Sequence, residues 1–177
     1  MIKYDIDTSC PCTTTTTALP RCHIHQLVIK LKHVTTLLQN KYKQFQSSIA
    51  APQPPCSDIG NNHHSAAPRS HSDLVNLLFD SYKITSKVAL NIAIVQQHNN
   101  SRLQDLPTSQ LGGVLCYMKR LLVTRDFGTE ITLHNSTLAA MDVSQIVPYT
   151  CQTLKDSVHL LKQVKTNILE TFYSRRR

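Results

Sequence analysis

Cysteine and histidine are the residue types in this chain whose spacing could support chemistry, with six and nine copies respectively. One compact group near the N-terminus reads C-x-C and then C-H-x-H: Cys10, Cys12, Cys22, His23 and His25. Thiolate and imidazole are the ligands that zinc prefers, so this group is a candidate zinc site. Its spacing differs from that of common zinc fingers, and no second compact cysteine pair follows. We therefore expect no bound metal and no cofactor.

Disulfide formation is the other chemistry open to the cysteines. Two pairings, Cys22 with Cys116 and Cys56 with Cys151, would tie distant parts of the chain together. Each would close a loop of about 95 residues, which is worth about 4–5 kcal/mol in lost chain entropy. Six cysteines allow 15 pairings, and Cys10 and Cys12 remain unassigned. Six reduced thiols buried as small apolar side chains are the alternative.

Catalytic motifs are absent from the sequence. It contains no G-x-S-x-G, no H-E-x-x-H and no glycine-rich phosphate loop. The 11 Asp and Glu residues form no cluster suited to general acid and base catalysis. We expect a binding protein, not an enzyme.

The elements that must position these residues are helices. At 177 residues, with 41% hydrophobic side chains, only four glycines and no tryptophan, the chain favours one helical domain. Apolar residues recur at steps of three and four in four segments, which predict helices over 22–48, 72–98, 107–124 and 148–174. Residues 1–21 are predicted as a flexible tail and 175–177 as a basic one. Ser72 is the expected N-cap of the second helix, and Pro107 and Pro148 are expected in the first turns of the third and fourth.

The connections between these helices are long, short and long. A short link joins antiparallel neighbours, whereas a parallel neighbour needs a link that travels back along the helix. The pattern therefore predicts an all-α, up-up-down-down four-helix bundle with long first and third crossover loops. Part of the third connection, Glu130–Leu133, is expected to form a short strand.

The chain is basic, with a formal net charge of +8. Such a balance favours acidic partner surfaces or acidic glycans such as heparan sulfate. We expect no nucleic-acid partner, because the basic residues are spread and the aromatic residues fall mostly at core spacing. We expect no membrane insertion, since no segment is apolar enough, and we expect a monomer.

Glycosylation and secretion are connected expectations. Asn99 and Asn135 each begin an N-x-S/T sequon in a predicted loop. The first residues show no apolar run typical of a signal peptide. The cysteine pattern nevertheless favours an extracellular protein, which would make this a mature chain with an added Met or an incomplete gene product.

The cysteine positions and several short stretches of sequence resemble the leukaemia inhibitory factor and oncostatin M branch of the interleukin-6-type cytokine family. The resemblance is stronger to oncostatin M. The resemblance rests on Cys22, Cys56, Cys116 and Cys151, on Val114–Met118 leading to Leu121 and Leu122, and on Cys151–Leu154. It spans about residues 20–174. The family implies the bridges Cys22–Cys116 and Cys56–Cys151 in a disulfide-stapled long-chain bundle.

The resemblance also implies a function. Family members are extracellular ligands that assemble class I cytokine receptors, namely a shared signal-transducing receptor and a second, larger one, to trigger kinase and transcription-factor signalling. The shared receptor would contact a face of the first and third helices that includes the residues Lys32, Thr36, Ser109, Gly112 and Gly113. The adjacent glycines would either let a receptor approach closely or let helices pack closely.

The contact with the second receptor departs from the family pattern. A Phe-x-x-Lys motif at the start of the fourth helix makes this contact in the family, and here Ser144 and Val147 occupy those positions. Val147 and Tyr149 are the candidates to replace it, with Tyr149 as the anchor. An interferon-like or other helical cytokine is one alternative. An intracellular helical interaction protein with reduced or zinc-binding cysteines is the other.

Overall fold

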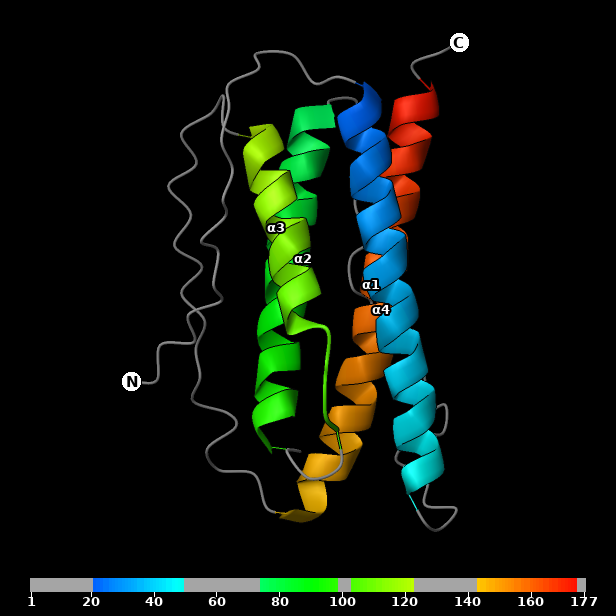
Figure 1. The fold of residues 1–177 in the computed structure, drawn as a ribbon, viewed down its shortest axis with the longest axis vertical. Helices are drawn as coiled ribbons and strands as arrows, with labels where there is room; N and C mark the ends of the chain where they lie inside the picture. The colour runs from blue at the N-terminus through cyan, green and yellow to red at the C-terminus, as the bar shows by residue number, and fades with distance from the viewer. Residues whose placement is uncertain (1–20, 50–73, 99–102, 123–142, 175–177) are drawn as a thin grey trace, which may run out of the picture.

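A computed structural model describes residues 21–49, 74–98, 103–122 and 143–174 of the chain. Within these ranges it contains four helices and no strand (Figure 1). They are α1 (Arg21–Ser48), α2 (Leu74–His98), α3 (Thr108–Leu122) and α4 (Val143–Ser174). The prediction of an all-helical fold is confirmed for the described residues. The expected strand at 130–133, the expected cap at residue 72 and the expected end of the third helix at 124 lie outside the described residues.

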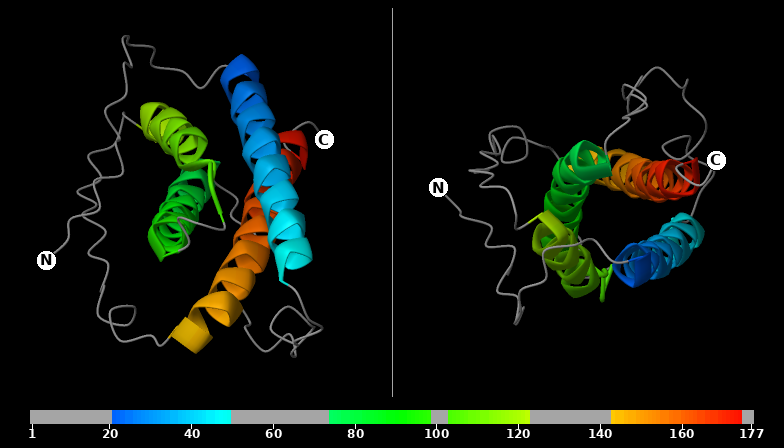
Figure 2. Two further views of the ribbon diagram at one scale, coloured as in Figure 1. Left: turned by 60° about the horizontal axis from the view of Figure 1, so that its bottom comes forward. Right: turned by 90° about the horizontal axis from the view of Figure 1, so that it is seen from above.

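The four helices form a ring around one core. Helices α1 and α2 run in one direction, and α3 and α4 run in the opposite direction (Figure 1). Helix α1 packs against α4 and α3, and α2 packs against the same two helices, so the order around the ring is α1, α3, α2, α4 (Figure 2). Helices α1 and α2 are therefore parallel and sit at opposite corners.

The core is built from the apolar positions that recur every three or four residues. Leu27, Leu31 and Leu38 of α1 are fully buried, as are Leu154 and Leu161 of α4. Every buried polar side chain among the described residues is a serine or threonine. The Oγ1 atoms of Thr35 and Thr85 donate to backbone carbonyls of their own helices, at 2.6 and 2.7 Å. The described core thus holds no charged side chain.

An extended segment completes the core below the short helix α3. Residues 103–107 run up the bundle to the start of α3 (Figure 1). Leu103 and Leu106 are only 2% and 5% exposed and belong to the core cluster. Asp105 turns the chain between them with a φ of 58°, a left-handed conformation that Asp tolerates better than most residues. The backbone oxygen of Gln104 accepts a 2.7 Å hydrogen bond from Lys41 Nζ, which pins the segment to α1.

The start of the fourth helix differs from the prediction. Helix α4 begins at Val143, so Pro148 lies inside the helix instead of in its first turn. Proline has no N–H, which leaves the carbonyl of Ser144 without its helical donor. Both residues are exposed, so water can bond that carbonyl and the helix continues. Cys151 consequently lies about two turns into α4 and not in its first turn.

This position of Pro148 leads to a stability prediction. Pro148→Ala should raise the free energy of unfolding by about 1 kcal/mol, because alanine restores the donor to Ser144 and relieves the ring contact, partly offset by a freer unfolded chain. Thermal unfolding followed by circular dichroism measures the change. Gln145→Ala, an exposed position in the same turn, should change it little. A loss of stability in Pro148→Ala would show that the helix starts at the proline.

Candidate functional site

The described part of the chain shows neither a group of metal ligands nor a membrane-spanning helix. Within it, no three Cys, His, Asp or Glu residues are grouped so that they could hold a metal ion. No described helix combines the length and the apolar character needed to cross a membrane. Of the five expected zinc ligands, only His25 has a described side chain, and it is exposed on α1. The other four, which include Cys10 and Cys12, lie outside the described side chains.

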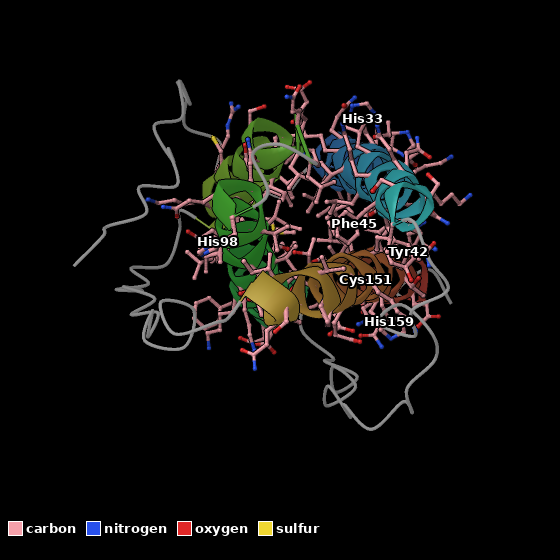
Figure 3. The ribbon with its side chains drawn as sticks, turned by 90° about the horizontal axis from the view of Figure 1, so that it is seen from below. His33, Tyr42, Phe45, His98, Cys151 and His159 are labelled. Atoms are coloured by element: carbon pink, nitrogen blue, oxygen red, sulfur yellow. The ribbon has the colours of Figure 1, made fainter. Side chains whose placement is uncertain are left out.

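Both cysteines whose side chains the structure describes are in disulfide bonds. Cys116, half-buried on α3, and Cys151, buried on α4, are each disulfide-bonded. Figure 3 shows Cys151 on the inner side of α4. The predicted partners, Cys22 and Cys56, are not among the described side chains, so the pairing stays a prediction.

One flank of α1 faces α3. The ammonium of Lys30 lies 5.8 Å from the ring centroid of Tyr117 on α3, within the range of a cation–π contact. Lys41, eleven residues later, reaches the segment that leads into α3. Eleven residues are close to three whole helical turns, so both lysines point to the same side of α1. This side defines the seam between α1 and α3.

Gly113 leaves bare backbone beside that seam. It lies one turn before Tyr117 on α3 and is exposed. A Cβ atom built on Gly113 would meet no atom within 4 Å, so no packing inside the described structure requires a glycine there. Gly112 is buried, which fits the packing alternative and makes it unavailable to a partner. Ser109 is exposed a turn earlier, and its Oγ atom hydrogen-bonds Gln110 Oε1 at 3.0 Å.

An isolated apolar side chain lies on the outer side of α1. Ile29 is 47% exposed, and it is the one large hydrophobic residue in the described structure that is counted as exposed. His33 follows one turn later and also points outward (Figure 3). We use the name α1–α3 face for the exposed surface that these residues make with the seam: Ile29, Lys30, His33, Gly113 and Tyr117.

Lys32 and Thr36 lie elsewhere on α1. At 100° per residue, Lys32 is turned about 200° from Lys30 and so lies on the flank away from α3. Thr36 lies on the outward side, where its Oγ1 donates to the carbonyl of Lys32 at 2.9 Å. Both are exposed. The structure therefore does not bring Lys32 together with the α3 residues that were predicted to share its face.

The residues expected at the start of the fourth helix are only partly accessible. Val147 and Tyr149 are half-buried and pack against the core cluster. They flank the exposed Pro148 near the N-terminal end of α4. The two sequon asparagines, Asn99 and Asn135, lie outside the described residues.

Sequence reasoning missed three members of the α1–α3 face: Ile29, Lys30 and Tyr117. Ile29 had one sequence signal, because it is an apolar residue placed off the three- and four-residue spacing of Leu27 and Leu31. No sequence signal indicated the contact between Lys30 and Tyr117, because it depends on how α1 is rotated about its axis relative to α3.

Comparison with known proteins adds no relative. No protein-family model, curated protein or solved structure matches this chain.

Proposed function

We propose that this protein is a secreted helical cytokine that assembles class I cytokine receptors at the cell surface. The shared signal-transducing receptor would bind the α1–α3 face, and a receptor of the leukaemia inhibitory factor or oncostatin M type would bind near Val147 and Tyr149. Signalling would then pass through receptor-associated kinases to transcription factors. The protein itself would act by binding and not by catalysis.

One observation carries the proposal, and it is the order and direction of the helices. The ring α1, α3, α2, α4, with α1 parallel to α2, is the arrangement that an up-up-down-down bundle requires. Bundles with only short hairpin links place α1 beside α2 instead. The same arrangement was expected from the long, short and long connections between the predicted helices. The resemblance to interleukin-6-type cytokines rests on other features, chiefly the four cysteines.

The oxidised cysteines support the extracellular half of the proposal. Disulfides persist in secreted proteins and are rare where thiols are kept reduced. Cys116 and Cys151 are both disulfide-bonded, which speaks against an intracellular protein with reduced or zinc-binding cysteines. An interferon-like cytokine stays an alternative, and it would tie different helices together.

The α1–α3 face has the composition of a receptor contact. Binding energy in such interfaces is concentrated in a few anchors surrounded by polar groups. Tyr117 and Ile29 can supply the apolar anchors, with Lys30 already placed over the tyrosine ring. Gly113 would let a partner's backbone or ring approach α3 without meeting a side chain.

Gly113→Tyr tests this contact. The tyrosine side chain has open space to occupy, so the fold should stay intact, but it would cover the seam. We expect binding to the ectodomain of the shared receptor of interleukin-6-type cytokines to weaken at least roughly tenfold, measured by surface plasmon resonance. Gly113→Ala is the matched control, since its single methyl group should keep both the fold and most of the binding.

Two results would contradict the proposal. If folded and oxidised wild-type protein binds no receptor ectodomain of this family, the proposed function is wrong. Normal binding by Gly113→Tyr would keep the function and move the contact away from the α1–α3 face.

A further inference from the structure

Helix α1 carries positive charge with no compensating carboxylate. Its 28 residues include five cationic side chains and no Asp or Glu: Arg21, Lys30, Lys32, Lys41 and Lys43. The lysines of α2 and α4 share their helices with carboxylates, Asp80 on the first and Asp156 and Glu170 on the second. Helix α3 also has no carboxylate, but it carries only two cations, Lys119 and Arg120. The excess charge of the described helices is therefore not evenly spread, and α1 carries the largest share of it.

Two lysines of α1 have no partner among the described residues. Lys30 and Lys41 are engaged with Tyr117 and with the backbone of Gln104. Lys32 and Lys43 are exposed, and the structure gives them no side-chain hydrogen bond or ion pair with any described residue. They are eleven residues apart, which is three turns plus about 20°, so they stand on one line about 16 Å apart.

Two polar residues extend this line. His25 precedes Lys32 by seven residues and Thr36 follows it by one turn, and both are exposed within about 40° of the same direction. We call His25, Lys32, Thr36 and Lys43 the basic stripe. It lies on the flank of α1 away from the Lys30–Tyr117 contact, and Ile29 of the α1–α3 face borders it on the outward side of the helix.

A straight line of fixed cations is complementary to a linear polyanion. Each lysine that meets an anionic group releases condensed counterions, and this release drives binding at low and physiological salt. The absence of carboxylates along α1 removes the repulsion that would otherwise oppose such a partner. The hydroxyl of Thr36 and the imidazole of His25 can add hydrogen bonds between the charged contacts.

We propose that the basic stripe binds a sulfated polysaccharide of the glycosaminoglycan class. A nucleic acid is the other linear polyanion, but proteins that hold single strands stack successive bases on several aromatic rings, and the stripe offers only the imidazole of His25. The extracellular location, where sulfated glycans occur, is taken from the proposed function, which the disulfide bonds of Cys116 and Cys151 support. Because the stripe lies away from the Lys30–Tyr117 contact, a glycan held there would leave Tyr117 and Gly113 on α3 uncovered.

Heparin binding of the full, oxidised chain tests the stripe. Lys32→Gln/Lys43→Gln should weaken heparin affinity roughly tenfold at physiological salt and reduce the slope of log affinity against log salt by about two. The matched control is Lys87→Gln/Lys119→Gln, which removes the same charge from exposed positions on α2 and α3. We expect the control to change affinity less than about twofold, with the thermal unfolding of both variants unchanged.

Three outcomes would overturn the proposal. Equal weakening by the two double variants would mean that only total charge matters. Competition by single-stranded DNA as strong as that by heparin would point to nucleic acid. No heparin binding by the wild type at physiological salt would mean that no such site exists. Receptor binding is a separate readout: Lys32→Gln/Lys43→Gln should keep it, and its absence in the wild type would leave the heparin result standing.

Discussion

Replacing Cys116 with serine should lower the free energy of unfolding by about 4 kcal/mol. The half-cystine on α3 is disulfide-bonded, and its predicted bridge to Cys22 closes a loop of about 95 residues. Losing so long a loop gives the unfolded chain a large gain in entropy, while the half-buried sulfur itself contributes little packing. Guanidinium unfolding of the oxidised protein, followed by circular dichroism, measures the loss.

A set of double variants identifies the partner of Cys116. If Cys22 is the partner, Cys22→Ser/Cys116→Ser should be about as stable as Cys116→Ser alone, because both changes break the same bridge. Cys56→Ser/Cys116→Ser should break two bridges and be destabilised about twice as much. The reverse order of stabilities would assign Cys116 to Cys56 and would remove the cysteine argument for the cytokine resemblance.

Leu103→Ala should cost about 2–4 kcal/mol, although the residue lies outside any helix. Its side chain is 2% exposed within the core cluster, so truncation removes buried apolar surface and leaves a cavity. Gln104→Ala is the matched control, because only the backbone oxygen of Gln104 takes part in the contact with Lys41. Urea unfolding of both variants measures the difference.

A cost below about 0.5 kcal/mol for Leu103→Ala would contradict the described packing. It would mean that residues 103–107 lie loosely on the surface and that α3 alone closes this side of the bundle.

The helices could be predicted because their apolar residues keep helical spacing. Leu27, Leu31 and Leu38 in α1 are separated by four and seven residues, and Leu154 and Leu161 in α4 by seven, which are helical spacings built from steps of three and four, and all five are buried. The start of α4 could not be predicted in the same way. Proline is most frequent in the first turn of helices. The free-energy cost of a proline further inside depends on whether the carbonyl that loses its N–H donor can reach water. Here that carbonyl belongs to Ser144, which is exposed.

The candidate surface was predictable only in part. Gly113 was a candidate because a glycine in mid-helix is unfavourable for stability. Its exposure agrees with the explanation that it lets a receptor approach closely, and not with close helix packing. Lys32 and Lys30 look equivalent in the sequence, yet only Lys30 reaches α3. Which lysine faces a neighbour depends on the rotation of α1 about its axis, and packing among all four helices sets that rotation. Leu103 and Leu106 were not predicted as core residues because two leucines in a short link show no periodicity.

The ring order has a consequence for how the chain reaches its native state. Helical bundles usually fold fast because elements that follow each other in sequence also touch, which keeps the contact order low. Here α2 and α3 are the one pair of described helices that follow each other in the sequence and also pack together. Both helices that pack against α1 come from the second half of the described bundle. The search for the α1–α4 contact must close a loop that contains α2 and α3, at an entropic cost that grows with loop length. Helix α1 therefore completes the bundle late unless an oxidised cysteine pair has already brought its end near α3.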